Sequence, residues 1–498
     1  MGRLVLAAVV ALAWCAETLP AAGEPATSPR ALLLLSHSMN SQFVPVERAF
    51  HLLRLSEAAN RIAPDLTKPW AEELFRTCEK LPPSWDRAAL LKNGVIAIAA
   101  VDPSSALEHL GSQAPPVWTD AGVAPEDLRA SAARSVFRAV WARQGHGASP
   151  SIRRVARRIG KTGLYPFGAV APLIKELQST NQRAARDWTA EAIAFFRNRP
   201  RFEVADTEYQ ELIRLSWDGS DALLRRSLLE AAIESLSRPD VRQENATYEA
   251  RLHFGNGVAR FNTPRIKTLA GLLPLVRDID PAWAARLVAS HPELAPAGTQ
   301  EATYAEAVTI HRIPGSTASS ADLLRVVRRG FEAQKLGYLD TLLADDWAHA
   351  RSVAQELTEP DLRCEAFAKL AIANPAEADG LSELARRELA HVVALADQLR
   401  CRASILEAAV GAGDPQDASR LWLSAMQMGE ELFLEQVDLQ PLTPAYKIPV
   451  MEDLRPVVVA GIRLERVQAL RRVQSVTYAP LRAYLLIYAA EALAEAAR

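Results

Sequence analysis

A short pattern repeated between residues 346 and 423 constrains the fold of this chain more than any other feature. Each copy opens with Asp or Asn, continues with Trp or Pro, and has Ala four residues after its opening residue. An oxygen at the opening position can accept hydrogen bonds from free N–H groups at a helix start, and Pro fits the first helical position because it lacks an N–H. We therefore predict three helix starts, whose repeated Ala residues are buried where two helices approach closely. The residues concerned are Asp346, Ala350, Asn374, Pro375, Ala378, Asp414, Pro415 and Ala418.

A second pattern alternates with the first. The segments Leu362-Arg363-Cys364 and Leu399-Arg400-Cys401 have the same residue order and lie 37 residues apart (400 − 363). A repeat length in the thirties with two helices in each repeat is typical of an α-solenoid, in which helix pairs stack on their neighbours. We therefore predict an all-α fold, built as a superhelical array of antiparallel helix pairs and elongated or arc-shaped.

One turn of the chain resembles a known repeat family. Gly413 and Asp414, followed by Ala418, resemble the turn and the second-helix Ala of a tetratricopeptide repeat. The match covers this single turn. The aromatic and Gly positions in the first helix of that family are not matched, and Leu406 stands where the family has a small residue. The resemblance implies a tetratricopeptide- or HEAT-like helical superhelix and the function of no specific family.

Composition and charge narrow the class further. Of the 498 residues 49% are hydrophobic and only 23 are Gly, and Ala is abundant, which favours helices. No run of alternating β-branched residues is long enough to predict a sheet. The formal net charge is −2. A nucleic-acid-binding protein needs a strongly basic face, so we expect no nucleic acid partner.

The N-terminal residues predict export. Residues 1–3 include one Arg, residues 4–14 form an apolar run too short to span a bilayer, and residues 21–23 are small enough for cleavage. We expect residues 1–23 to be a signal peptide and the mature protein to be periplasmic or extracellular. No other segment has the length and hydropathy of a transmembrane helix, so none is expected.

Pro- and Gly-containing breaks divide the rest of the chain. We expect N-terminal helical repeats in residues 24–111 and a middle helical region in residues 112–311. The middle region contains an irregular, hairpin-like insert near residues 254–264, where two glycines flank an Asn. Residues 312–320 read as a linker, and residues 321–498 are expected to form the C-terminal helical repeats.

Three cysteines remain after residue 23, too few for a disulfide framework. Cys364 and Cys401 occupy the same position in successive repeats. Helices stacked in register lie about 8–10 Å apart, and a disulfide needs Cα atoms within about 7 Å. We therefore predict that Cys364 and Cys401 are buried free thiols. A disulfide staple between the repeats stays open as the alternative, because a shifted register would bring the sulfurs together.

The motifs of common enzymes are missing from the sequence. It has no Gly-x-Ser-x-Gly elbow, no His-Glu-x-x-His helix, no Cys-x-x-Cys pair and no phosphate-binding Gly-x-x-x-x-Gly-Lys loop. Glu388 and His391 have the Glu-x-x-His spacing of di-iron bundles, but such a site needs a second copy, which the chain lacks. We identify no catalytic residue and expect neither a metal nor a cofactor.

The strongest charge feature is a basic cluster in residues 153–161. Its cations surround three branched apolar residues at helical spacing, which predicts an amphipathic helix. The functional interpretation is an anion-binding face for an acidic partner, an anionic glycan or lipid head groups. The alternative is a solvated helix face paired with acidic neighbours. The cluster consists of Arg153, Arg154, Arg157, Arg158 and Lys161.

Two functions from different classes are consistent with these features. The first is an exported, non-enzymatic repeat scaffold that holds a protein or peptide in a concave groove, with a possible anionic contact through residues 153–161. The second is an exported α-helical enzyme that acts on cell-wall or extracellular polysaccharide. Such an enzyme would use two facing carboxylates, and the sequence does not single out which two.

Overall fold

The structure is a computed structural model of the chain. It describes residues 28–113, 127–198, 203–236, 247–254, 257–261, 263–299, 302–310, 320–440 and 443–498. The predicted signal peptide lies outside the described residues. Within the described part helices predominate, as the sequence predicts. No helix among these residues is long and apolar enough to cross a membrane.

The chain forms two compact units. Unit 1 combines residues 1–82 with residues 318–498, and unit 2 consists of residues 83–317. These borders differ from the breaks in the sequence, because the two helices in residues 85–112 pack with the helix that follows them and belong to its unit. The N-terminal block 24–111 is thus shared between both units.

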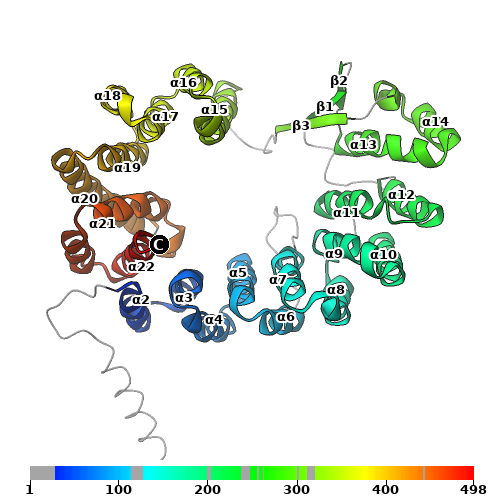
Figure 1. Cartoon of the computed structure of the whole chain (residues 1–498), viewed down its shortest axis with the longest axis horizontal. Coiled ribbons are helices and arrows are strands. Elements are labelled where there is room, and N and C mark those ends of the chain that lie inside the picture. The colour runs from blue at the N-terminus through cyan, green and yellow to red at the C-terminus, as the bar shows by residue number, and fades with distance from the viewer. Residues whose placement is uncertain are drawn as a thin grey trace, which may run out of the picture. The chain divides into compact units, whose positions relative to one another are not determined.

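Unit 2 is built from two layers of helices and a small sheet (Figure 1). Helices α5, α7, α9, α11 and α13 form one layer, and α6, α8, α10, α12 and α14 form the other. Neighbours within a layer pack on each other, as in the pairs α5–α7, α9–α11 and α10–α12. The elements are α5 (Trp85–Val101), α6 (Pro103–Ser112), α7 (Leu128–Gln144), η2 (Gly145–Ala148), α8 (Ser149–Thr162), α9 (Phe167–Thr180), α10 (Gln182–Arg197), α11 (Glu203–Ser216), α12 (Ala222–Leu236), α13 (Pro264–Ile279), α14 (Pro281–Ser290) and η4 (Pro292–Thr299).

A three-stranded antiparallel sheet lies against α13. Its strands are β1 (Thr247–Phe254), β2 (Gly257–Phe261) and β3 (Ala302–Ile310), in the order β2-β1-β3. Ala250 lies opposite Phe261 on one side and Ala307 on the other. The β1–β2 hairpin falls on the glycine-containing insert noted in the sequence. The β3 strand was not expected, although residues 303–310 are rich in Thr, Tyr and Val, residues that favour strands.

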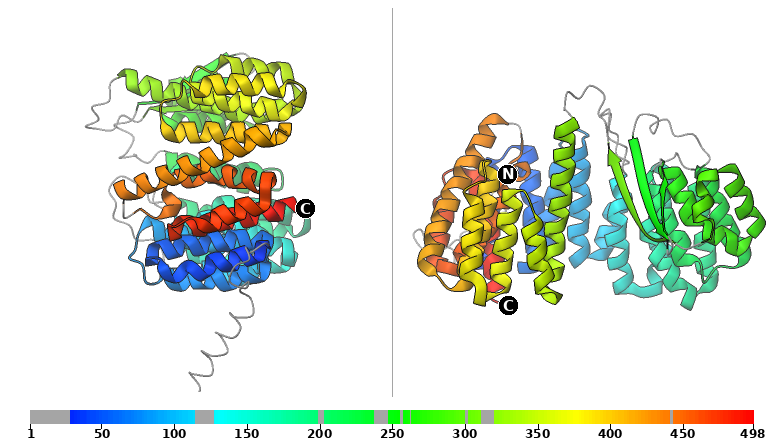
Figure 2. Two further views of the ribbon diagram at one scale, coloured as in Figure 1. Left: turned by 90° about the vertical axis from the view of Figure 1, so that its left-hand side faces the viewer. Right: turned by 90° about the horizontal axis from the view of Figure 1, so that it is seen from above.

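Unit 1 joins the two described ends of the chain (Figures 1 and 2). Helix α22 packs against α21 and also against α2 and α3. Its apolar residues from Leu481 to Leu493 are almost all buried, which a terminal helix exposed on one side would not allow. The elements are α2 (Pro29–Ser38), η1 (Met39–Gln42), α3 (Pro45–Ile62), α4 (Pro64–Cys78), α15 (Ser320–Asp345), α16 (Trp347–Glu356), α17 (Pro360–Ala373), η5 (Pro375–Glu377), α18 (Ala378–Leu389), α19 (Leu395–Ala412), α20 (Pro415–Leu439), η6 (Ala445–Lys447), α21 (Val450–Ser475) and α22 (Ala479–Ala496).

The repeated Asp and Asn residues cap helices of unit 1. The side chain of Asp346 accepts a hydrogen bond from the backbone N–H of His349 at 3.0 Å, and that of Asp414 accepts one from Asp417 at 3.1 Å. Asn374 caps a short 3₁₀ turn, η5, so the α-helix α18 begins only at Ala378. The Ala residues of the pattern, Ala350, Ala378 and Ala418, are all buried.

Candidate anion-binding site

Helix α8 presents a continuous basic face because its apolar and its basic residues each recur at helical spacing and therefore lie on different sides of the helix. Ile152, Val155, Ala156 and Ile159 lie on one side and are buried. The five cations of the predicted cluster occupy the remaining surface and fall into two rows. Residues four apart on a helix lie above one another, so Arg153, Arg157 and Lys161 form one row. Arg154 and Arg158 form the adjacent row.

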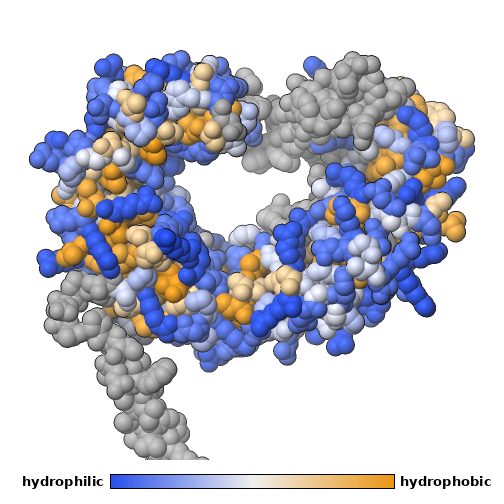
Figure 3. All heavy atoms as spheres, viewed as in Figure 1, coloured by the Kyte–Doolittle hydropathy of each residue, from blue (hydrophilic) through white to orange (hydrophobic). Residues whose placement is uncertain are grey.

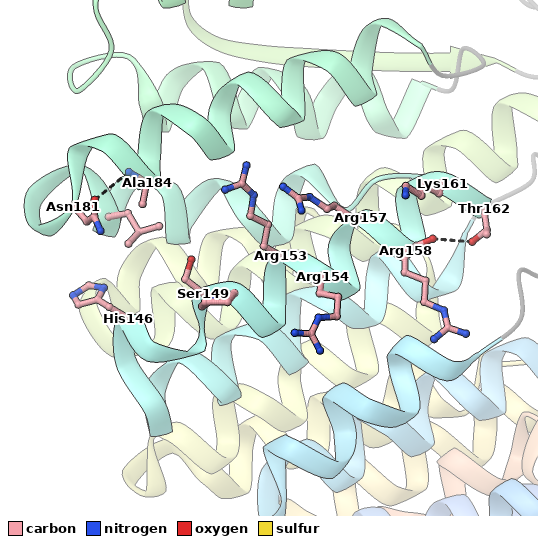
Figure 4. A pocket seen from close by; sticks show the side chains of 12 residues that line it. His146, Ser149, Arg153, Arg154, Arg157, Arg158, Lys161, Thr162, Asn181 and Ala184 are labelled. Atoms are coloured by element: carbon pink, nitrogen blue, oxygen red, sulfur yellow. Dashed lines mark hydrogen bonds between the residues drawn. The ribbon is translucent and has the colours of Figure 1, made fainter.

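These side chains line a groove of about 870 Å³ beside α8 (Figure 4). Helices α8 and α10 pack less closely than α6 and α8 or α10 and α12, and the side chains of Arg153 and Arg157 reach across from α8 toward α10. In the close view Arg153 and Arg157 point toward α10, whereas Arg154 and Arg158 point to the opposite side of α8. The lining residues are His146, Ser149, Pro150, Arg153, Arg154, Arg157, Arg158, Lys161, Thr162, Leu177, Asn181 and Ala184.

One largely buried carboxylate of α10 anchors the row that faces it. Oxygen Oε2 of Glu191 accepts a hydrogen bond from Nε of Arg153 at 2.7 Å and from Nε and Nη2 of Arg157 at 2.7 and 2.5 Å. Arg153 also donates to the backbone carbonyl of Asp187 at 3.1 Å. The bond to Glu191 raises the pKa of Arg157 above its ordinary value. A single carboxylate thus balances one of two guanidinium charges and fixes both side chains in place.

The other three cations have no such partner. Arg154, Arg158 and Lys161 are exposed, and none of them forms an ion pair with another residue in the described parts of the chain. The sequence around them supplies no acid, because no Asp or Glu occurs between Asp127 and Glu176. On the face that Figure 3 draws, mainly hydrophilic residues cover α8 and α10. The groove therefore carries a net positive charge that the protein itself leaves unbalanced.

A hydrogen bond and a ring stack hold α10 against the segment that follows α8. Nε1 of Trp188 on α10 donates to the hydroxyl of Tyr165 at 2.9 Å, and the ring of Tyr165 stacks on Phe195 with centroids 4.6 Å apart. Complete burial raises the pKa of Tyr165, so its hydroxyl stays neutral. Asn181 caps α10 by accepting a hydrogen bond from the backbone N–H of Ala184 at 3.1 Å. These contacts join α10, which carries Glu191, to the segment after α8.

A second polar constellation, which the sequence did not suggest, lies between α2, α3 and α22. Oγ of Ser36 is 2.8 Å from Nε2 of His51, and Nδ1 of His51 is 2.7 Å from Oδ1 of Asn40. The order Ser–His–Asn resembles a nucleophile, a base and an orienting group. However, all three residues are buried. The single hydroxyl proton of Ser36 also has the carbonyl oxygen of Ala483 as an acceptor at 2.8 Å, which ties this hydroxyl to the backbone of α22. The constellation is a structural network that joins α22 to α2 and α3.

The remaining candidates from the sequence have structural roles. Glu388 accepts a hydrogen bond from Arg363 at 2.6 Å, which occupies the carboxylate that a metal would need. No group of His, Cys, Asp and Glu side chains among the described residues could hold a metal ion. Cys364 and Cys401 are buried free thiols. Contact with the Cys364 thiol, together with burial, raises the pKa of Cys401.

Comparison with family models and curated proteins finds no relative of this chain. No protein-family model and no curated protein sequence matches the chain. The function must therefore be argued from the site itself.

Proposed function

We propose that this protein is a non-enzymatic helical-repeat scaffold, an α-solenoid, that binds an acidic segment of a partner protein in the groove beside α8. The observation that carries the proposal is the groove lined by two rows of cations, one of which is anchored by Glu191. The solenoid part is supported by sequential packing, since helices of each unit pack mainly on their neighbours in the chain.

The charge pattern favours recognition of anions over catalysis. Arg guanidinium groups bind carboxylates through charge-assisted hydrogen bonds, and Arg157, which Glu191 holds in place, loses little entropy when it does so. The groove lining contains no acidic side chain and no thiol, and its hydroxyls belong to Ser149 and Thr162. A carboxylate pair or an activated nucleophile for catalysis is therefore not offered by this lining.

An array of immobilised peptides with acidic, neutral and basic sequences tests the proposal with the full chain. We expect retention on acidic peptides that weakens as the salt concentration rises, because exposed charge pairs are screened. The double variant Arg154→Glu/Arg158→Glu should lose this retention. The double variant Arg387→Glu/Arg420→Glu makes the same charge change at exposed arginines of unit 1 and should retain it. Equal retention of acidic and neutral peptides would overturn the proposal.

A further inference from the structure

The geometry of α8 indicates what form the acidic partner takes. We infer that the groove accepts an extended strand with a run of four consecutive Asp or Glu residues, lying parallel to α8 and alternating its side chains between the two rows of cations. This inference rests on the proposed function, because it specifies the ligand of the same groove.

The two rows provide cations at axial positions that an extended strand can match. Along a helix each residue rises by about 1.5 Å, so relative to Arg154 the cations of Arg157, Arg158 and Lys161 start about 4.5, 6 and 10.5 Å further along the axis. An extended strand rises by about 3.3 Å per residue and points successive side chains to opposite sides. Four consecutive acidic residues would therefore lie at about 0, 3.3, 6.6 and 9.9 Å.

The directions of the basic side chains match the alternation of an extended strand, just as their spacing does. Arg154 and Arg158 point to one side of α8, and Arg157 points to the other, toward α10 (Figure 4). Lys161 is in the row of Arg157 by its spacing of four residues. The first and third acidic residues of a strand would thus face Arg154 and Arg158, and the second and fourth would face Arg157 and Lys161. The mismatch at any position is about 1 Å, which a flexible Arg or Lys side chain absorbs.

Arg153 and Glu191 position the groove rather than contact the strand. Arg153 is less exposed than Arg157, with 25% of its side chain accessible against 49%, and it also binds the backbone of α10. Nη1 of Arg157 is not used in the bonds to Glu191, so this atom can donate to a ligand while Nε and Nη2 hold Glu191.

Other polyanions fit this site less well. A membrane-binding helix inserts its apolar face into the lipid, but Ile152, Val155 and Ile159 of α8 are buried in the protein. Single-stranded nucleic acids are held by stacking on Phe, Tyr or Trp, and the groove lining has none of these. A sulfated oligosaccharide shares the anionic chemistry and is therefore included in the test as a competing ligand class.

Fluorescence anisotropy of labelled peptides with the full chain tests the inference. One peptide carries four consecutive Glu residues in a Gly/Ser frame, and the other carries four Glu residues separated by three Gly or Ser residues each. We expect the consecutive peptide to bind about tenfold more tightly, because only it brings all four charges onto the two rows. The variant Arg154→Ala/Arg158→Ala should weaken its binding about tenfold, and Arg154→Lys/Arg158→Lys should largely preserve it.

The possible outcomes distinguish a failure of the proposed function from a failure of the extended-strand inference. If neither peptide binds, the proposed function fails, and the inference fails with it. If both peptides bind equally, the protein recognises acidic peptides but the extended-strand register is wrong. If a sulfated oligosaccharide binds more tightly than the consecutive peptide and loses affinity in the alanine variant, the ligand class is wrong. Circular dichroism of each variant checks that the helical fold is intact. If the alanine variant misfolds, the lysine variant still tests the inference.

Discussion

His51 is a buried residue whose lowered pKa makes the stability of the protein depend on pH. Its ring is fully buried between Ser36 and Asn40, and desolvation, with a smaller repulsion from His37, lowers its pKa to about 3. An unfolded His has a pKa of about 6.5. The unfolded chain therefore binds a proton between these values that the folded chain excludes. Stability from His51 is fully present above pH 6.5 and is lost progressively as the pH falls toward 3.

The His51→Gln variant tests this linkage. At pH 7.5 we expect it to be less stable than the wild type, because Gln fits the network between Ser36 and Asn40 imperfectly. At pH 5 the gap should shrink by about 2 kcal/mol, since only the wild type loses stability by protonation of this residue in the unfolded state. Urea unfolding followed by circular dichroism measures the gap at both pH values. All other titrating groups are common to both proteins, so a gap that does not change with pH would refute the account.

At the scale of elements, the contact between α20 and α21 depends on a glycine. A Cβ atom on Gly461 of α21 would lie 2.2 Å from Nε1 of Trp422 on α20, and the indole is buried and rigid. The Gly461→Ala variant should therefore unfold at lower urea concentration, with a loss of about 1–3 kcal/mol. Gly380 of α18 has open space around it, so Gly380→Ala should be neutral or stabilise the helix by up to about 1 kcal/mol. Similar urea midpoints for both variants would contradict the close approach of α20 and α21.

Elements differ in how far the sequence alone predicts them. The starts of α16 and α20 could be predicted because an Asp cap is a local signal that acts within three residues. The two basic rows of α8 could be predicted because helical spacing is also local. The groove could not, since it needs Glu191 of α10 to lie across from Arg153 and Arg157. The β3 strand pairs with β1 across more than forty residues, and no local signal specifies that partner.

At the scale of the whole molecule, contacts between residues distant in the sequence determine which helices belong to unit 1, and the repeated sequence pattern does not predict this. Ser36 bonds to the carbonyl of Ala483, and Glu47 accepts a hydrogen bond from the backbone N–H of Ala445 at 2.6 Å. Such pairs, about four hundred residues apart, place the N-terminal helices in unit 1. Charge is distributed just as unevenly. Although the net charge is −2, the segment between Asp127 and Glu176 has Arg and Lys but no acidic residue.

Photo-cross-linking of the consecutive-Glu peptide to the full chain tests the central claim most directly, because it surveys the whole surface at once. The peptide carries a photoreactive group at one end, and mass spectrometry locates the attached residues. We expect cross-links in residues 149–162 and 177–184, which line the groove, with a lower yield for Arg154→Ala/Arg158→Ala and at high salt. Cross-links concentrated in unit 1, or a yield that is unchanged in that variant, would contradict the assignment of the α8–α10 groove as the binding site.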